Sequence, residues 1–133
     1  MTICEYKSWR AHEIVPLYES VGWLRYAKNP VALEKAYENS LCVLAAYEGD
    51  KLAGILRAVG DGVSIVFIQD LLVYPQWQRR RIGTALVKAL LEKYPNVYQM
   101  ELLTDDTDKT AAFYRAVGFR EAREAGCVSF VRM

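Results

Sequence analysis

The sequence is poor in the residues that hold metals and disulfides. Its 133 residues include one histidine, His12, and three widely spaced cysteines, Cys4, Cys42 and Cys127. This odd number of cysteines gives little support to a disulfide framework or a zinc site. We therefore expect no metal, and we interpret the cysteines as small buried apolar groups in a reducing cytoplasm.

Long apolar runs and an excess of one charge are also absent. No window of about eighteen apolar residues occurs, so we expect no membrane span, and the first ten residues lack the apolar core of a signal peptide. Lysine and arginine total 17 and aspartate and glutamate total 16, a net charge of +1. Because dedicated nucleic-acid-binding proteins carry a large basic excess, this balance argues against a nucleic-acid partner.

The residues that are present indicate one ordinary folded domain. Hydrophobic residues make up 53% of the chain and charged residues 25%, which is typical of soluble globular proteins. Nine tyrosines, three tryptophans and four phenylalanines exclude disorder as the main state, since they supply ample surface to bury. The length fits a single domain, which we place over residues 1–133.

The hydrophobic pattern changes between strand and helix periods along the chain. We expect strands at 3–6, 41–47, 52–59, 63–74, 97–104, 119–122 and 127–132, joined by turns at 48–51 and 60–62. We expect helices at 30–37, 82–94 and 107–117, and a first helix between a Ser8 cap and Gly22. This order predicts an α/β fold with a mixed sheet, in which the nearly uninterrupted 63–74 strand lies inside the sheet.

A basic loop precedes the helix expected at residue 82. Arg79, Arg80 and Arg81 come directly before it, and no Ser, Thr, Asp or Asn stands immediately ahead to cap the helix. A helix N-terminus carries a partial positive charge, so cations are unfavourable there and a missing cap leaves N–H groups free. Free N–H groups beside arginines are typical of a phosphate site. A solvated basic loop is the alternative interpretation.

The residues around this loop resemble the central signature of the GNAT superfamily of N-acetyltransferases. That signature is a strand ending V-x-P, an aromatic residue, and then Q/R-x-x-G-x-G/A at the start of a helix. The matching residues are Val73, Pro75, Trp77, Gln78 and Gly83. Arg81 stands where the first glycine is usual. A second register, starting at Arg80, fits the letters but breaks the spacing to Val73, so we reject it.

Two further segments support the resemblance. Residues 110–119, TAAFYRAVGF, resemble the family's F-Y-x-x-x-G-F segment, and residues 17–23 resemble the first helix of short bacterial members. The order of elements agrees across nearly the whole chain. The resemblance implies the acyl-CoA N-acyltransferase fold, a mostly antiparallel mixed sheet flanked by four helices, in which parallel strands at 63–73 and 97–104 splay apart.

The resemblance also implies acetyl-coenzyme A as the co-substrate, without a metal. Its pantetheine arm would pair with open backbone at 71–73, where a β-bulge is expected, and its pyrophosphate would bind N–H groups where the helix begins. Arg79 and Arg80 are the candidates for the phosphates. The expected cofactor-binding residues are Leu71, Leu72, Val73, Gln78, Arg79, Arg80, Arg81, Ile82, Gly83, Thr84, Ala85 and Phe113.

Two residues are candidates for catalysis by direct attack of an amine on the thioester. Tyr114 matches the family tyrosine that protonates the departing thiolate, and a phenol with a pKa of about 10 stays protonated at neutral pH. Asp70, the only charge within 63–74, is the leading base, and a backbone N–H near Leu72 would polarise the carbonyl. Tyr114 could instead be a packing aromatic, and Asp70 a structural carboxylate paired with an arginine.

The acceptor is expected to be a small-molecule amine in the cytoplasm. Trp23 and Tyr26 occupy the region that lines the acceptor site in relatives, or else are core or dimer-contact aromatics. Asp105, in the acidic run 101–108, could attract a cationic amine, although a solvated loop with a helix cap at Asp106 or Thr107 is the more ordinary interpretation. A homodimer is left open. The competing functions are a non-catalytic acyl-CoA sensor and a nucleic-acid-binding module that uses Arg79–Arg81.

Overall fold

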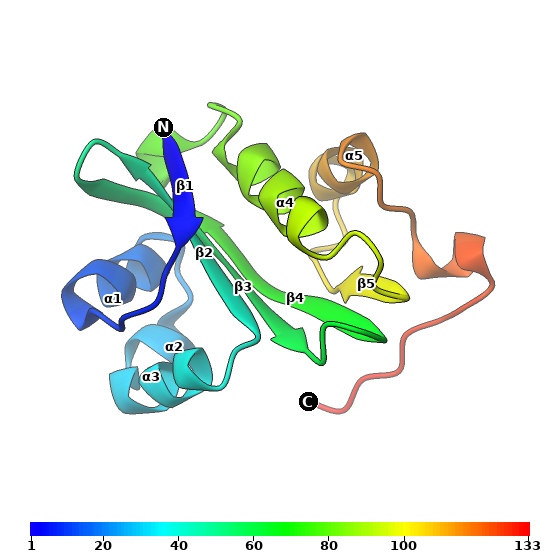
Figure 1. Ribbon diagram of the computed structural model, residues 1–133, viewed down its shortest axis with the longest axis horizontal. Helices are drawn as coiled ribbons and strands as arrows, with labels where there is room; N and C mark the ends of the chain where they lie inside the picture. The colour runs from blue at the N-terminus through cyan, green and yellow to red at the C-terminus, as the bar shows by residue number, and fades with distance from the viewer. The chain divides into compact units, whose positions relative to one another are not determined.

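The computed structural model describes all 133 residues and divides into two compact units, Met1–Leu103 and Thr104–Met133 (Figure 1). The first unit contains a five-stranded sheet with four helices, and the second contains one helix and a short 3-10 turn. No helix of the structure combines the length and the apolar character that crossing a membrane requires.

The sheet is mixed and mostly antiparallel, as expected. Its strands are β1 (Thr2–Glu5), β2 (Cys42–Glu48), β3 (Lys51–Gly60), β4 (Ile65–Val73) and β5 (Gln99–Leu102), and they lie side by side in that order. The first three pairings are antiparallel and the β4–β5 pairing is parallel. The strand β4 therefore lies inside the sheet with a neighbour on each side.

Two turns join the central strands. The expected turn at 48–51 is present between β2 and β3, where Gly49 has a φ of +62°, a conformation that glycine adopts without steric cost. At the next turn, the carboxylate of Asp61 accepts the N–H groups of Val63 and Ile65 at 2.9 and 3.1 Å. These local bonds satisfy groups that a strand would use, so β4 begins at Ile65 and not at residue 63.

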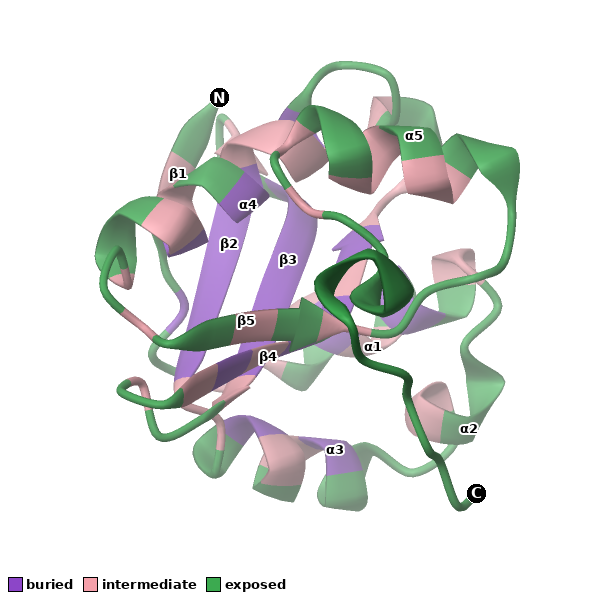
Figure 2. Cartoon of the chain, turned by 90° about the vertical axis from the view of Figure 1, so that its right-hand side faces the viewer, coloured by how far each residue is buried: buried purple, intermediate pink, exposed green.

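Helices cover both faces of the sheet in the first unit (Figure 1). The helices α1 (Ala11–Ser20), α2 (Leu24–Ala27) and α3 (Pro30–Glu38) lie on one face, and α4 (Ile82–Lys93) lies on the other. Leu17 of α1 and Leu33 of α3 pack into one core cluster with residues of the sheet. Figure 2 shows that burial is most continuous along β2 and β3.

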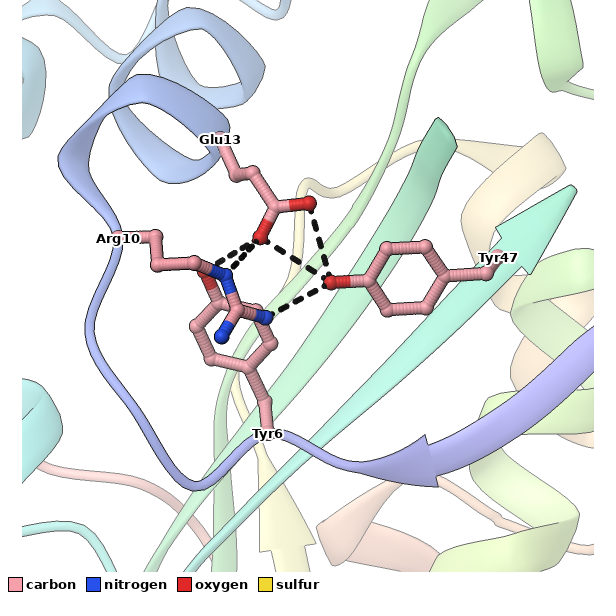
Figure 3. A network of polar contacts seen from close by, with 4 residues as sticks. All are labelled: Tyr6, Arg10, Glu13 and Tyr47. Atoms are coloured by element: carbon pink, nitrogen blue, oxygen red, sulfur yellow. Dashed lines mark hydrogen bonds and ion pairs between the residues drawn. The ribbon is translucent and has the colours of Figure 1, made fainter. Parts of the chain in front are cut away.

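The start of the first helix differs from the expectation. The helix begins at Ala11, its N-cap is Arg10, and no side chain there caps it, so the predicted Ser8 cap is wrong. Instead, a polar network holds the helix against the strands (Figure 3). Glu13 accepts hydrogen bonds from Arg10 at 2.6 Å, from Tyr6 at 3.0 Å and from Tyr47 at 3.1 Å.

The network explains why a local cap is not needed. Burial alone would raise the pKa of Glu13, but the hydrogen bonds from Arg10, Tyr6 and Tyr47 together hold the pKa below its usual value. Charge-assisted hydrogen bonds are about twice as strong as neutral ones. The network therefore supplies contacts from the loop that follows β1 and from β2, which fix the helix where a side-chain cap is absent.

The second helix, α2, was not anticipated, whereas α3 follows the expectation. Four residues are too few to show a helical period, so sequence patterning gives α2 no signal. In α3, Pro30 is the first residue of the helix, and the side chain of Asn29 accepts a hydrogen bond from the N–H of Ala32 at 3.2 Å. The helix ends at Glu38 with Asn39 as its C-cap.

The end of the second unit differs from the elements that the sequence predicts. The helix α5 (Asp108–Ala116) is capped by Thr107, which accepts the N–H of Thr110 at 3.2 Å, so one of the two expected caps is confirmed. The strands expected at 119–122 and 127–132 are absent. Reciprocal bonds between Glu121 and Glu124 instead close a 3-10 turn, η2 (Ala122–Ala125), and such local bonds compete directly with a strand ladder.

The cysteines are free, and only one of them is buried. Cys42 lies in the core on β2, whereas Cys4 and Cys127 are exposed. The expectation of buried cysteines is therefore wrong for two of the three, because an edge strand and an unpaired C-terminal segment carry them.

Candidate active site

The strand β4 extends beyond its parallel partner. Its pairing with β5 ends at Ile68 opposite Leu102, but β4 continues to Val73. Within the first unit, residues 69–73 thus have β3 on one side and no strand on the other. The pairing ends because β5 itself ends at Leu102, and within this unit it leaves backbone N–H and C=O groups of β4 open for hydrogen bonding.

A β-bulge lies where the parallel pairing ends. Arg57 of β3 is opposite Asp70, but the next residue, Ala58, is opposite Ile68. Gln69 is therefore an extra residue in β4. The expected bulge is present, two residues before Leu71, and bulges of this kind re-aim the residues that follow them.

The register after the bulge decides which backbone groups face the open side. The N–H of Tyr74 donates to the carbonyl of Ala53 on β3 at 2.9 Å. In an antiparallel pair, the backbone N–H and C=O groups of successive residues alternate between bonding to the partner strand and pointing away from it. The backbone groups of Leu72 therefore point toward β3, whereas those of Leu71 and Val73 point away from it. The carbonyl of Val73 indeed accepts a hydrogen bond from the Gln78 side chain at 3.2 Å. The N–H of Leu72 thus belongs to the sheet ladder, and those of Leu71 and Val73 face the side of β4 that has no strand partner in this unit.

The chain then leads directly to an uncapped helix. After the 3-10 turn η1 (Pro75–Trp77), the N-cap of α4 is Arg81, and no side chain caps it. The first intrahelical bond at this end runs from Ala85 N–H to the Arg81 carbonyl at 3.0 Å. The N–H groups of Ile82, Gly83 and Thr84 therefore have no partner within the helix, which is the arrangement that binds anions.

Three exposed arginines surround this helix end. Arg79 and Arg81 have positive φ angles, 66° and 62°, in the left-handed region that favours glycine. The guanidinium of Arg80 lies 5.0 Å from the ring centroid of Trp77, a cation–π contact. None of the three takes part in an ion pair. Their positive charge is therefore uncompensated beside free N–H groups.

Asp70 lies in the core and not in an open cleft. It is 1% exposed, and its Oδ2 atom receives hydrogen bonds from Arg57 Nε at 2.7 Å and from the Tyr18 hydroxyl at 2.8 Å. The Tyr18 hydroxyl also lies 3.0 Å from that of Tyr37. This is the arginine-paired, structural role that the sequence analysis held as its alternative. A carboxylate enclosed in this way has no surface from which to take a proton from a bound amine.

The residues that surround Asp70 were not among the candidates that the sequence indicated. Arg57 is 5% exposed, and Arg57 and Asp70 are the only charged side chains that the core buries. Burial raises the pKa of Tyr18 and of Tyr37 far above the usual range, so both hydroxyls remain protonated. A signal was available, because Arg57 is the only charge in the run 52–59, as Asp70 is in its own run.

Trp23 and Tyr26 form an aromatic group beside this buried cluster. Their ring centroids lie 6.0 Å apart and 6.1 and 5.6 Å from that of Tyr18. Trp23 remains 37% exposed, so the group reaches the surface. Tyr26 also lines a pocket of about 370 Å³, together with Arg25, Asn29, Ala32, Leu33 and Ala36.

The remaining candidates lie in the second unit. Tyr114 of α5 packs between Phe113 and Phe119, whose ring centroids are 4.9 and 6.0 Å from its own. Burial raises the pKa of Tyr114 above its ordinary value, so its hydroxyl is a proton donor throughout the neutral range. Asp105 is exposed before α5, and its backbone carbonyl accepts the Thr110 hydroxyl at 2.7 Å.

Comparison with known proteins decides the family. The model of the acetyltransferase (GNAT) family matches residues 7–119, most of the chain. The chain belongs to the GNAT family of acetyltransferases. A GNAT-family acetyltransferase from Streptococcus pneumoniae TIGR4 has 36% sequence identity and a TM-score of 0.89, with 99% of this chain and 96% of that chain covered.

Other relatives are more distant. An uncharacterized N-acetyltransferase, ycf52, of Gracilaria tenuistipitata var. liui is 28% identical over 114 residues, which cover 81% of this chain and 60% of that protein. The chain thus spans less than two thirds of the length of the curated relatives that it matches. An aminoglycoside 6'-N-acetyltransferase complexed with coenzyme A shares the fold at a TM-score of 0.72 and 20% identity, over 89% of this chain and 84% of that chain.

Proposed function

We propose that this GNAT protein transfers the acetyl group of acetyl-coenzyme A to a primary amine of a small molecule. The observation that carries the proposal is the continuity of residues 69–85. An open strand edge with free N–H groups at Leu71 and Val73 is followed along the chain, after η1, by the uncapped start of α4, which three arginines without ion-pair partners flank.

These residues fit the chemistry of coenzyme A. The amides of a pantetheine arm are spaced along an extended chain and can pair with Leu71 and Val73 in the manner of an added strand. Phosphate oxygens match the N–H groups of Ile82, Gly83 and Thr84, and Arg79–Arg81 supply the counter-charge. Support also comes from the structural neighbour that was solved in complex with coenzyme A.

In the proposed reaction, the neutral amine attacks the carbonyl carbon of the thioester. A C–N bond forms, the C–S bond breaks and the sulfur leaves with the electron pair of that bond. The N–H of Leu71 or Val73 polarises the carbonyl oxygen. Tyr114 donates its proton to the departing sulfur, for which its protonated phenol is suited. Water takes the proton that the amine loses, since Asp70 is enclosed in the core, and a proton from solvent then restores the Tyr114 phenol.

We place the acceptor beside Trp23 and Tyr26, with Asp105 as a further candidate contact for a cationic group. Aromatic faces attract ammonium groups and also pack against apolar parts of a ligand. Fold neighbours of this chain include an aminoglycoside acetyltransferase solved with sisomicin and AAC(6')-Iy solved with the bisubstrate analogue CoA-S-monomethyl-acetylneamine, which supports a small-molecule amine. We further propose that residues 1–133 act as one catalytic domain, because the family match spans both units.

The test measures thiol release from acetyl-coenzyme A across a panel of amines, with calorimetry of coenzyme A binding on the same samples. We expect release with at least one amine, and a lower rate in Tyr114→Phe. Tight binding of coenzyme A without release for any amine in the panel would instead support a non-catalytic acyl-CoA sensor. Absence of binding would refute the coenzyme A site itself.

A further inference from the structure

Three features coincide at one point of β4. The pairing with β5 ends at Ile68, the extra residue of the bulge is Gln69, and the buried carboxylate of Asp70 follows. Directly opposite, Arg57 is the residue at which the β3 register shifts, and its Nε atom lies 2.7 Å from Asp70 Oδ2. An ion pair thus bridges the two strands at the bulge itself.

Stability alone does not explain the ion pair between Arg57 and Asp70. The Oδ1 atom of Asp70 is buried and has no hydrogen-bond partner in the protein, and an incompletely satisfied buried carboxylate lowers stability. Buried ion pairs can often be replaced by apolar residues of similar volume with little loss, whereas they can specify one arrangement among several. The location of the pair therefore argues for a role in specifying register.

The surrounding contacts hold Asp70 from several elements. Tyr18 of α1 donates to the same carboxylate oxygen as Arg57, and the Tyr18 hydroxyl contacts that of Tyr37 of α3. The guanidinium of Arg57 lies 5.8 Å from the ring centroid of Tyr37. Movement of the bulge along β4 would separate Asp70 from all of these partners.

The position of the bulge decides which N–H groups are open. Because strand residues alternate sides with a period of two, a shift of one residue would turn Leu72 outward and would turn Leu71 and Val73 into the sheet. The proposed function requires the N–H groups of Leu71 and Val73 to point outward, because these groups pair with the pantetheine arm.

We propose that Arg57 and Asp70 are positioning residues, which lock the bulge at Gln69 and so aim the N–H groups of Leu71 and Val73 at the pantetheine arm and thioester. Neither side chain touches the substrate. The inference rests on the proposed function for the identity of the ligand, but the bulge itself can be measured without any ligand.

The first test replaces the ion pair by apolar residues in Arg57→Met/Asp70→Leu and compares two ligands. Adenosine 3',5'-bisphosphate carries phosphates but no pantetheine arm, so it reports on the α4 end alone. We expect the affinity for coenzyme A to fall at least about tenfold, the effect of two lost hydrogen bonds of ordinary strength, while that for the bisphosphate changes less than about twofold. Unchanged coenzyme A affinity, or an equal loss for both ligands, would overturn the proposal.

A second measurement follows hydrogen exchange of single amides by NMR. In the wild type, Leu72 N–H should exchange slowly, and those of Leu71 and Val73 quickly. We expect this contrast to be lost in the double variant and in Asp70→Asn, which serves in its place if the double variant does not fold. Preservation of the pattern in a folded variant would refute the positioning role.

The matched control is Ile14→Ala, which opens a cavity in the same core without touching the bulge. Ile14 is fully buried on α1, so this variant loses stability by packing alone. We expect it to keep the exchange pattern and both affinities. If the wild type binds neither ligand but shows the pattern and loses it in the variants, the proposed function fails and the positioning inference stands.

Discussion

The backbone at Arg81 allows the strain and the charge of the α4 start to be separated. Arg81 is the N-cap of α4, with φ 62° and ψ 20°. A side chain in this left-handed conformation destabilises the native state by about 1 kcal/mol relative to glycine. Arg81→Ala keeps this strain but removes the charge, whereas Arg81→Gly removes both.

The two variants are therefore expected to differ in stability and to agree in binding. Removal of a cation from a helix N-terminus stabilises by about 0.5 kcal/mol, so Arg81→Ala should gain about that amount. Arg81→Gly should gain about 1.5 kcal/mol in total, a rise in melting temperature of roughly 5 °C. Both should bind coenzyme A about fivefold more weakly at low salt, with a smaller salt dependence than the wild type.

Thermal unfolding and calorimetric titration at several salt concentrations check these values. Equal stability of the glycine and alanine variants would show that Arg81 does not carry the left-handed strain. Wild-type coenzyme A affinity in both variants would show that its guanidinium does not meet a phosphate. Arg81→Ala, which removes the charge but keeps the left-handed backbone strain, is thus the control for the effect of that strain on stability.

Three further outcomes are expected. Tyr114→Phe should lower kcat about 10- to 100-fold with little change in the KM for acetyl-coenzyme A, as loss of a proton donor does; an unchanged kcat would remove Tyr114 from the mechanism. In Gly54→Ala, the added methyl group would lie 2.6 Å from the Leu72 carbonyl oxygen, so urea unfolding should show a loss of about 1–3 kcal/mol and coenzyme A should bind more weakly. Glu13→Gln should destabilise the protein at pH 7, because the folded pKa of Glu13 lies below its usual value. That contribution is present above the unfolded pKa of about 4.3 and is lost as the pH falls through the folded pKa, so stability curves of wild type and variant that stay parallel down to pH 2 would contradict it.

Local patterns in the sequence determined most of the elements. Proline, glycine and asparagine punctuation predicted α3, α4 and the turn at 48–51, and these signals act over a few residues. The uncapped, arginine-rich start of α4 could be read in the same way, because a missing cap is a property of neighbouring residues. The signature from Val73 to Gly83 then indicated the family.

Elements that depend on partners distant in the sequence were predicted less accurately. The expected strands at 119–122 and 127–132 are absent, since a strand requires a ladder partner that a local pattern does not supply. The polar bonds of Glu121 and Glu124 form a turn there instead. The helix α1 begins without the expected cap because contacts from Tyr6, in the loop after β1, and from Tyr47 of β2 hold Glu13 in place.

The sequence by itself thus determined the family, most of the elements up to α5 and the location of the arginine-rich loop before α4. Only the tertiary structure decided the position of the bulge, the outward direction of Leu71 and Val73, and the enclosure of Asp70 by Arg57 and Tyr18. The physical reason is that register and burial arise from pairing between residues far apart in the chain. A carboxylate in an apolar strand reads the same in sequence whether an arginine or a substrate faces it.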